Sequence, residues 1–319
     1  MARYLYLSDH HTTEYSNQFP ESSKEIWIDI PYQECEQIES LVQRIYKPHP
    51  AVINRILDGD RQQPSLLVQD DAVVFILSDY SGNLAHITPH HLGLFLGKHF
   101  LVTVHLGATS HVVDPAWEFV EKNHMLDEGV DFALYEVLSH HVRRFASVYI
   151  EAVKQYENLH DKLLEHPYKN LANQIVILRK DAMHLRKMIH PEQEIYALLK
   201  SSEVPYIAKK NRPYFHDVAS RAAELSSDVD SIRDGLSGMV QAYTSMQSNE
   251  INKVMKFLTI VSVLSLPATT IASIYGMNFF IPEIHWHYGY WYSLVVMLLI
   301  TILLLLYMNR REWLRIPKS

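Results

Sequence analysis

Two uncharged stretches near the C-terminal end constrain this 319-residue chain more than any other feature. They cover residues 257–275 and 290–308, and each has 19 residues without Asp, Glu, Lys or Arg. At 1.5 Å per residue such a helix is about 28 Å long, close to the ~30 Å hydrocarbon core of a bilayer. The sequence therefore predicts two transmembrane helices, about 254–275 and 290–308, joined by a loop at 276–289.

Basic residues flank these spans on one side of the membrane only. Lys253 and Lys256 precede the first span and Arg310 and Arg311 follow the second, whereas 276–289 has no Lys or Arg. By the positive-inside rule, both termini lie in the cytoplasm and the short loop faces outward. We expect a multi-pass protein of the inner (plasma) membrane.

The N-terminal part shows the pattern of a mixed α/β domain. Runs rich in β-branched, aromatic or leucine residues predict strands at 4–7, 25–30, 65–69, 72–78 and 100–105. Between them, 32–46 has apolar residues at helical spacing. The predicted fold class is α+β. Its parts are a cytoplasmic α/β domain at 1–130, a helical bundle and stalk at 131–253, and a transmembrane domain at 254–319.

Long helices follow this domain. The first is predicted at 132–164. The second is predicted at about 168–189, with a kink or break at Pro191, and continues toward Lys200. Pro213 is placed as the first residue of a third helix, where its missing N–H costs nothing. Without a stop signal, that helix continues to residue 275 and so carries the stalk into the first span.

The third helix has a heptad seam. Its apolar residues alternate steps of four and three, which is typical of coiled-coil association. We expect this seam to join copies of the chain, and packing within the chain's own helical bundle is the alternative. The seam residues are Val218, Ala222, Leu225, Val229, Ile232, Leu236, Met239, Tyr243 and Met246.

The first span is the better candidate for lining an ion pathway, because it carries six Ser or Thr side chains and the second span only two. Two spans cannot enclose a pathway, so conduction would require a symmetric ring of subunits. One face of the first span mixes apolar side chains that could form a dewetting gate with polar ones that offer neutral oxygens. Ordinary helix packing is the alternative for these residues. They are Asn252, Met255, Leu258, Ser262, Leu266 and Thr269.

A four-residue motif, Tyr275-Gly276-Met277-Asn278, ends the first span. In this position it resembles the signature of the CorA family of divalent-cation (Mg²⁺) channels, and the terminal run 310–314 is also similar to that family. The resemblance implies a funnel-shaped homopentamer with a selectivity filter at these four residues. Mg²⁺ loses its water shell reluctantly. Asn278 carboxamides and Gly276 carbonyls could therefore hydrogen-bond the hydrated ion without stripping it.

The resemblance also implies that cytoplasmic Mg²⁺, bound between subunits, holds the pore shut. Asp217 falls where the family places a stalk aspartate of this regulatory site. Many family members have a Glu two residues after the motif's Asn, whereas this chain has Phe280 there. Glu283 is the candidate to supply the negative ring at the outer mouth instead. No ionisable residue lies in either span, which favours passive, potential-driven flux of Mg²⁺, and of Co²⁺ or Ni²⁺, over coupled transport.

Two other functions are considered. The chain has 19 histidines, including His285 and His287 in the outer loop, and imidazole suits Zn²⁺ better than Mg²⁺. A ZntB-like zinc transporter is therefore the main alternative. A soluble domain anchored by a helical hairpin is remote, because no phosphate loop, dinucleotide fingerprint or metalloprotease motif is present. We expect no enzyme activity, no organic cofactor and, at net charge −7, no nucleic-acid partner. The expected partners are further copies of the chain, membrane lipids and the transported cation.

Overall fold

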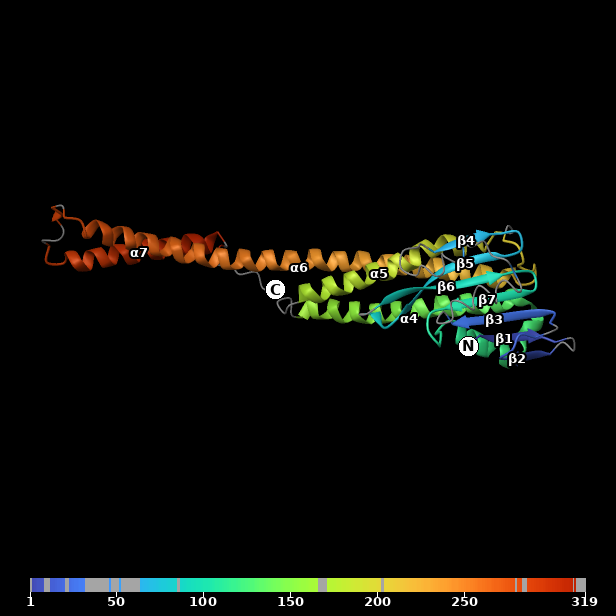
Figure 1. Ribbon diagram of the computed structural model, residues 1–319. Coiled ribbons are helices and arrows are strands. Elements are labelled where there is room, and N and C mark those ends of the chain that lie inside the picture. The colour runs from blue at the N-terminus through green and yellow to red at the C-terminus, as the bar shows by residue number, and fades with distance from the viewer. Residues whose placement is uncertain are drawn as a thin grey trace. The chain divides into compact units, whose positions relative to one another are not determined.

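The computed structural model divides the chain into two compact units, Met1–Val240 and Gln241–Ser319 (Figure 1). It describes residues 2–8, 12–20, 23–31, 46, 52, 64–84, 87–165, 171–201, 204–278, 280–282, 286–311 and 313. The helix predicted at 32–46 lies outside these residues, apart from Tyr46.

The first unit contains a seven-stranded sheet with the order β2-β1-β3-β7-β6-β5-β4. Only β3 and β7 pair in parallel, and the other neighbours are antiparallel. The five predicted strands are confirmed, and β2 and β6 were not predicted. The strands are β1 (Arg3–Leu7), β2 (Thr13–Ser16), β3 (Glu25–Pro31), β4 (Ser65–Val68), β5 (Val73–Ser81), β6 (Thr88–Leu96) and β7 (Phe100–His105).

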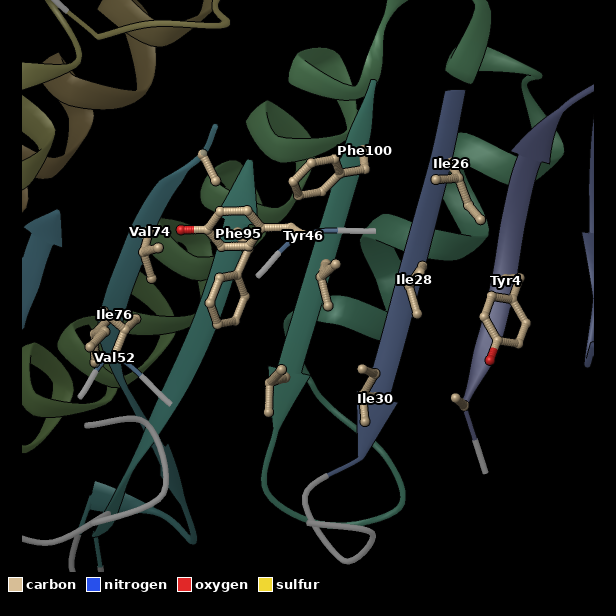
Figure 2. Close-up of a cluster of buried hydrophobic side chains, with 14 residues drawn as sticks. Tyr4, Ile26, Ile28, Ile30, Tyr46, Val52, Val74, Ile76, Phe95 and Phe100 are labelled. Carbon is tan, nitrogen blue, oxygen red and sulfur yellow. The ribbon is translucent and has the colours of Figure 1, made fainter. Parts of the chain in front are cut away.

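Alternation along β3 separates the two faces of the sheet, because successive side chains point to opposite sides. Ile26, Ile28 and Ile30 lie in one hydrophobic cluster (Figure 2). Trp27 and Asp29 alternate with them, and the Trp27 ring lies 4.9 Å from that of Trp117 on a helix. Both faces of the central strands are therefore covered.

The helices are α3 (Val113–Lys122), the short 3₁₀ helix η3 (Met125–Glu128), α4 (Val130–Glu165), α5 (Leu171–Leu198), α6 (Arg212–Tyr275) and α7 (Gly289–Arg310). Helices α4 and α5 run side by side, α4 against β3, β6 and β7, and α5 against β4 and β5 (Figure 1). The break considered at Pro191 does not occur, since α5 continues through it to Leu198. Pro213 is the second residue of α6 rather than the first. Its missing N–H is still one that the helix cannot use.

Most of the heptad seam of α6 is buried by other elements of the same chain. Its members from Val218 to Met239 are buried within the first unit. Side chains of α6 contact both neighbouring helices, as Arg186 of α5 pairs with Asp230 at 2.6 Å and Tyr135 of α4 packs on Phe215. The expectation of association between copies is therefore wrong for this part of the seam. A 3–4 spacing serves packing against helices of the same chain equally well.

Candidate functional site

Two helices are long and apolar enough to cross a membrane, α6 in its C-terminal part and α7. Their apolar windows are almost entirely unburied within the chain. Phe257 is 65% exposed and Leu298 62%. A core helix of a soluble protein would bury such side chains, whereas a membrane span leaves them for lipid or for other copies of the chain.

The six residues predicted to face a pathway all lie on α6 and are all exposed in the chain: Asn252, Met255, Leu258, Ser262, Leu266 and Thr269. Their spacing of three or four positions places them along one side of the helix. They are thus not buried within the single chain, and packing against helices of other copies stays the alternative for them. This surface is called the α6 face below.

Hydroxyl groups along this part of α6 bond to the helix itself. Thr269 Oγ1 donates to the Ser265 carbonyl at 2.9 Å, and Thr259 Oγ1 donates to the Met255 carbonyl at 2.8 Å. Each hydroxyl therefore uses its one hydrogen within the helix and presents oxygen lone pairs outward.

The predicted filter residues follow directly as α6 ends. Tyr275 is the last helical residue, and the Gly276 amide still donates to the Ala272 carbonyl at 3.0 Å. A Cβ on Gly276 would lie 3.3 Å from that same carbonyl oxygen, which is a tight contact. Gly276, Met277 and Asn278 are exposed. Their backbone and side-chain oxygens are thus available to a ligand.

The outer loop is described in part. Glu283, predicted at the outer mouth, and His285 lie outside the described residues. Phe280 is 82% exposed and His287 is also exposed. At the start of α7 the rings of Tyr290 and Trp291 are exposed and in contact, which is typical of the interfacial aromatic belt of a membrane protein.

Asp217, the predicted regulatory ligand, lies in the second turn of α6 and is 60% exposed at its side chain. Its carboxylate pairs with Arg221 of the same helix at 2.7 Å. Among the residues that the structure describes, no three His, Cys, Asp or Glu side chains are grouped to hold a metal. One chain therefore supplies at most part of a metal site at Asp217.

A buried polar cluster that the sequence did not predict joins the sheet to α4 and α5. The Ser78 amide of β5 donates to the Glu192 carboxyl, and His141 Nε2 lies 2.6 Å from the Ser78 carbonyl. Because a carbonyl only accepts, Nε2 carries the proton. Nδ1 then accepts from the Tyr196 hydroxyl at 2.9 Å. The two helices thus bond both the amide and the carbonyl of Ser78, beyond the point where the pairing of β5 with β4 stops at Ile76.

Burial favours the neutral forms in this cluster. It raises the pKa of the Glu192 carboxyl well above its usual range and lowers the pKa of His141. The nearby Asp79 is also buried, but hydrogen bonding and the Arg144 guanidinium at 3.0 Å keep its pKa below the ordinary value. The sequence carried no signal for this cluster, because Ser78 and Glu192 are 114 positions apart.

Comparison with known proteins gives a consistent result. The family model described as CorA-like Mg²⁺ transporter protein matches residues 22–311. The chain is 30% identical over 301 residues to the cobalt/magnesium transport protein CorA of Thermotoga maritima, covering 93% of this chain and 85% of that protein.

Solved structures share the fold. The complete CorA magnesium transporter of Methanocaldococcus jannaschii aligns with a TM-score of 0.81 at 23% identity, covering 98% of this chain and 99% of that one. The cytoplasmic domain of ZntB from Vibrio parahaemolyticus aligns with a TM-score of 0.62 at 10% identity, covering 77% and 97%. The α+β class, with its sheet domain, long helix and apolar C-terminal helix, is confirmed. From the family match and the identity across nearly its whole length, the chain belongs to the CorA-like Mg²⁺ transporter family, whose members are ion transporters and not enzymes.

Proposed function

We propose that this protein is a homopentameric channel of the inner membrane that lets Mg²⁺, and also Co²⁺, enter the cytoplasm. A ring is required because one chain offers only two spans, and two helices cannot enclose a pathway. The relatives named as cobalt/magnesium transport proteins support the choice of ions. The basic residues next to the spans support cytoplasmic termini.

The observation that carries this proposal is the exposed α6 face. A helix that only anchored a soluble domain would gain nothing from Asn252, Ser262 and Thr269 along one side. In a ring, the Met255, Leu258 and Leu266 side chains of the same face would form apolar constrictions that stop ions when water leaves them.

The polarity of the hydroxyl groups suits a hydrated cation. Water bound to Mg²⁺ points its hydrogens outward, so the wall of a pathway must accept hydrogen bonds. Thr269 and Thr259 already donate to their own helix and can offer only lone pairs outward. Neutral acceptors bind the hydration shell weakly enough for the ion to leave.

The motif at the end of α6 would act as the filter. The exposed Asn278 carboxamide and the Gly276 carbonyl supply neutral oxygens, and the crowding found at Gly276 explains why a larger residue would disturb this turn. Mg²⁺ prefers oxygen ligands and keeps several of its waters, so second-shell hydrogen bonding from a ring of such groups fits its chemistry.

The driving force follows from the charge of the ion. An inside-negative potential is worth about 2.3 kcal/mol per unit charge per 100 mV, hence roughly twice that for a divalent cation. Neither span contains Asp, Glu, Lys, Arg or His between 257 and 275 or between 290 and 308, so no proton carrier is built into them. Uptake driven by potential alone is the consistent mechanism.

Regulation by cytoplasmic Mg²⁺ is proposed to involve Asp217. Its carboxylate is exposed, and in the described part of the chain it forms an ion pair with Arg221. A Mg²⁺ ion held between subunits would compete with that arginine, and its loss would leave the ring free to open.

The test is ion uptake into sealed liposomes that contain the purified protein, under a fixed inside-negative potential. Mg²⁺, Co²⁺, Ni²⁺ and Zn²⁺ are compared with and without a pH gradient. We expect Mg²⁺ entry that ignores the gradient and falls at least about tenfold in Asn278→Ala, a change of ~1.4 kcal/mol. Asn309→Ala, at the exposed end of α7, is the matched control and should conduct normally.

Two results would contradict the proposal. Zinc-selective uptake that needs the pH gradient would favour a ZntB-like carrier. No flux of any ion, with the protein correctly inserted, would favour an anchored soluble domain.

A further inference from the structure

A cleft of about 570 Å³ lies in the first unit where β3 and α4 begin and the segment leading into α6 passes by. Residues 204–211, called the pre-α6 segment below, form one wall with Tyr206 and Lys210. The cleft is also lined by Glu25 of β3, by acidic residues of η3 and of the start of α4, and by Lys98.

Asp131 holds the pre-α6 segment in place. This buried carboxylate accepts hydrogen bonds from the Ala208 amide at 2.8 Å and from Asn211 Nδ2 at 3.0 Å. Lys210 adds an ion pair to Glu128 at 2.7 Å. Since α6 begins at Arg212, the position of its first turn depends on these contacts with the start of α4.

The held segment is strained. Tyr206 has φ of +67°, in the left-handed region that residues other than glycine rarely adopt. Such a conformation persists only where surrounding contacts impose it. Its hydroxyl donates to the Asp70 carbonyl at 2.9 Å, which is one of those contacts.

Glu25 lies beside this anchor without a partner for one of its oxygens. Two carboxyl groups lie next to Gly129, whose φ is +115°: a Cβ there would lie 2.5 Å from Asp131 Oδ1 and 3.9 Å from Glu25 Oε2. Within the described part of the chain, Glu25 Oε2 is buried and has no hydrogen-bond partner. A buried carboxylate oxygen without a partner disfavours the ionised form of the group.

Burial and the surrounding charges place the titration of Glu25 near neutral pH. Burial is the largest cause that raises its pKa, and Asp131 and Asp127 raise it further. A backbone hydrogen bond from Val130 and the charge of Lys210 act in the opposite direction. The result is a pKa of about 7, against an ordinary value of 4.5.

We propose that Glu25 is a pH-responsive latch: protonated, it lets the pre-α6 segment stay bound to the start of α4, and its ionisation loosens that segment. Ionised Glu25 repels the Asp131 carboxylate that bonds Ala208 and Asn211. It also attracts Lys210 away from Glu128. Because α6 is continuous to Tyr275, the latch acts on the first turn of the helix that carries the α6 face.

The sign and size follow from proton linkage. A carboxyl group whose pKa is raised in the closed form stabilises that form below its ordinary pKa of 4.5, and the stabilisation is lost as the pH rises through about 7. If the opened segment returns Glu25 to its ordinary value, opening becomes about tenfold more favourable between pH 6 and pH 8.

The experiment is hydrogen exchange, read by mass spectrometry on peptides of the full chain in detergent, at pH 6, 7 and 8. Rates are divided by the intrinsic chemical exchange rate at each pH. The readout is the peptide that contains the Ala208 amide. We expect its opening to rise about tenfold from pH 6 to pH 8 in the natural chain and to stay constant in Glu25→Gln. Glu118→Gln, on the exposed side of α3, should behave like the natural chain.

Three outcomes would overturn the latch. The first is a flat profile in the natural chain, and the second is the same slope in Glu25→Gln. The third is an equal rise in a peptide from β5, because that would report loosening of the whole unit. If Glu25→Gln does not fold, Lys210→Gln decides instead. It removes a charge that lowers the pKa of Glu25, so the midpoint of opening must move to higher pH.

Discussion

Replacing Glu192 by Gln should change how stability depends on pH, because burial raises the pKa of this carboxyl in the folded chain. Unfolded, Glu192 and His141 titrate near their ordinary values of 4.5 and 6.5. A carboxyl whose pKa is raised by folding stabilises the folded chain below pH 4.5, and this stabilisation is lost as the pH rises. The slope of that loss is at most about 1.4 kcal/mol per pH unit.

In Glu192→Gln the only titrating member is His141, whose pKa is lowered in the folded chain. Its stabilising contribution is complete above pH 6.5 and is lost as the pH falls below that value. The difference between natural chain and variant should therefore shift in favour of the variant as the pH rises above 4.5, with a slope of at most about 1.4 kcal/mol per pH unit.

The measurement is urea unfolding of the full chain in detergent at several pH values. With Trp286, Trp291 and Trp313 replaced by Phe in every variant, fluorescence of the contacting Trp27 and Trp117 rings reports the first unit. Glu194→Gln, exposed two residues further along α5, is the control and should give a curve parallel to the natural chain. Parallel curves for Glu192→Gln as well would refute the reasoning, since they would mean that Glu192 is ionised in the folded chain.

Two further substitutions test the packing of the first unit by the same unfolding assay. Gly235→Ala should destabilise by about 1–3 kcal/mol despite the better helix propensity of Ala, because the new Cβ would lie 2.8 Å from the Tyr156 hydroxyl oxygen. In a Tyr156→Ala background the same change should stabilise by up to ~1 kcal/mol, and destabilisation there would show that Tyr156 is not the obstacle. Asp29→Asn should cost about 3 kcal/mol, because it breaks buried pairs with Arg3 and His105. Asp29 raises the pKa of His105 against its burial, so the cost must be larger below pH 6.5 than at pH 8, and a cost independent of pH would contradict that pairing.

Helices were predicted correctly where one hydrophobic spacing extends over a long stretch of the sequence. The helix expected at 132–164 is α4, Val130–Glu165, and the first span ends at Tyr275 as expected. The strand β6 was missed because it begins with Pro89, His90 and His91, which do not resemble a strand, although its second half is buried. The strand β2 was missed because it is short and largely exposed, with only its pairing to β1 to define it.

The buried polar clusters could not be predicted for a different reason. His141 stands next to His140 in the sequence, and adjacent side chains on a helix point apart, so this pair gives no sign of a shared site. In the structure only His141 is fully buried, and its partners Ser78 and Tyr196 come from β5 and α5. Contacts between elements so distant in sequence depend on how the helices pack on the sheet, and no local pattern contains that information.

Helix α6 shows why its seam alone could not decide between association and internal packing. Up to Met239 the apolar residues are buried by α4 and α5, yet Ile251, Val254 and Phe257 further along are more than half exposed. The seam itself stops at Met246, because its next two positions are Glu250 and Lys253. An apolar surface of this size is not stable in water, so the part beyond Met239 requires lipid or further copies of the chain. The second unit as described therefore needs lipid or further copies of the chain around it, whereas the first unit contains its own core.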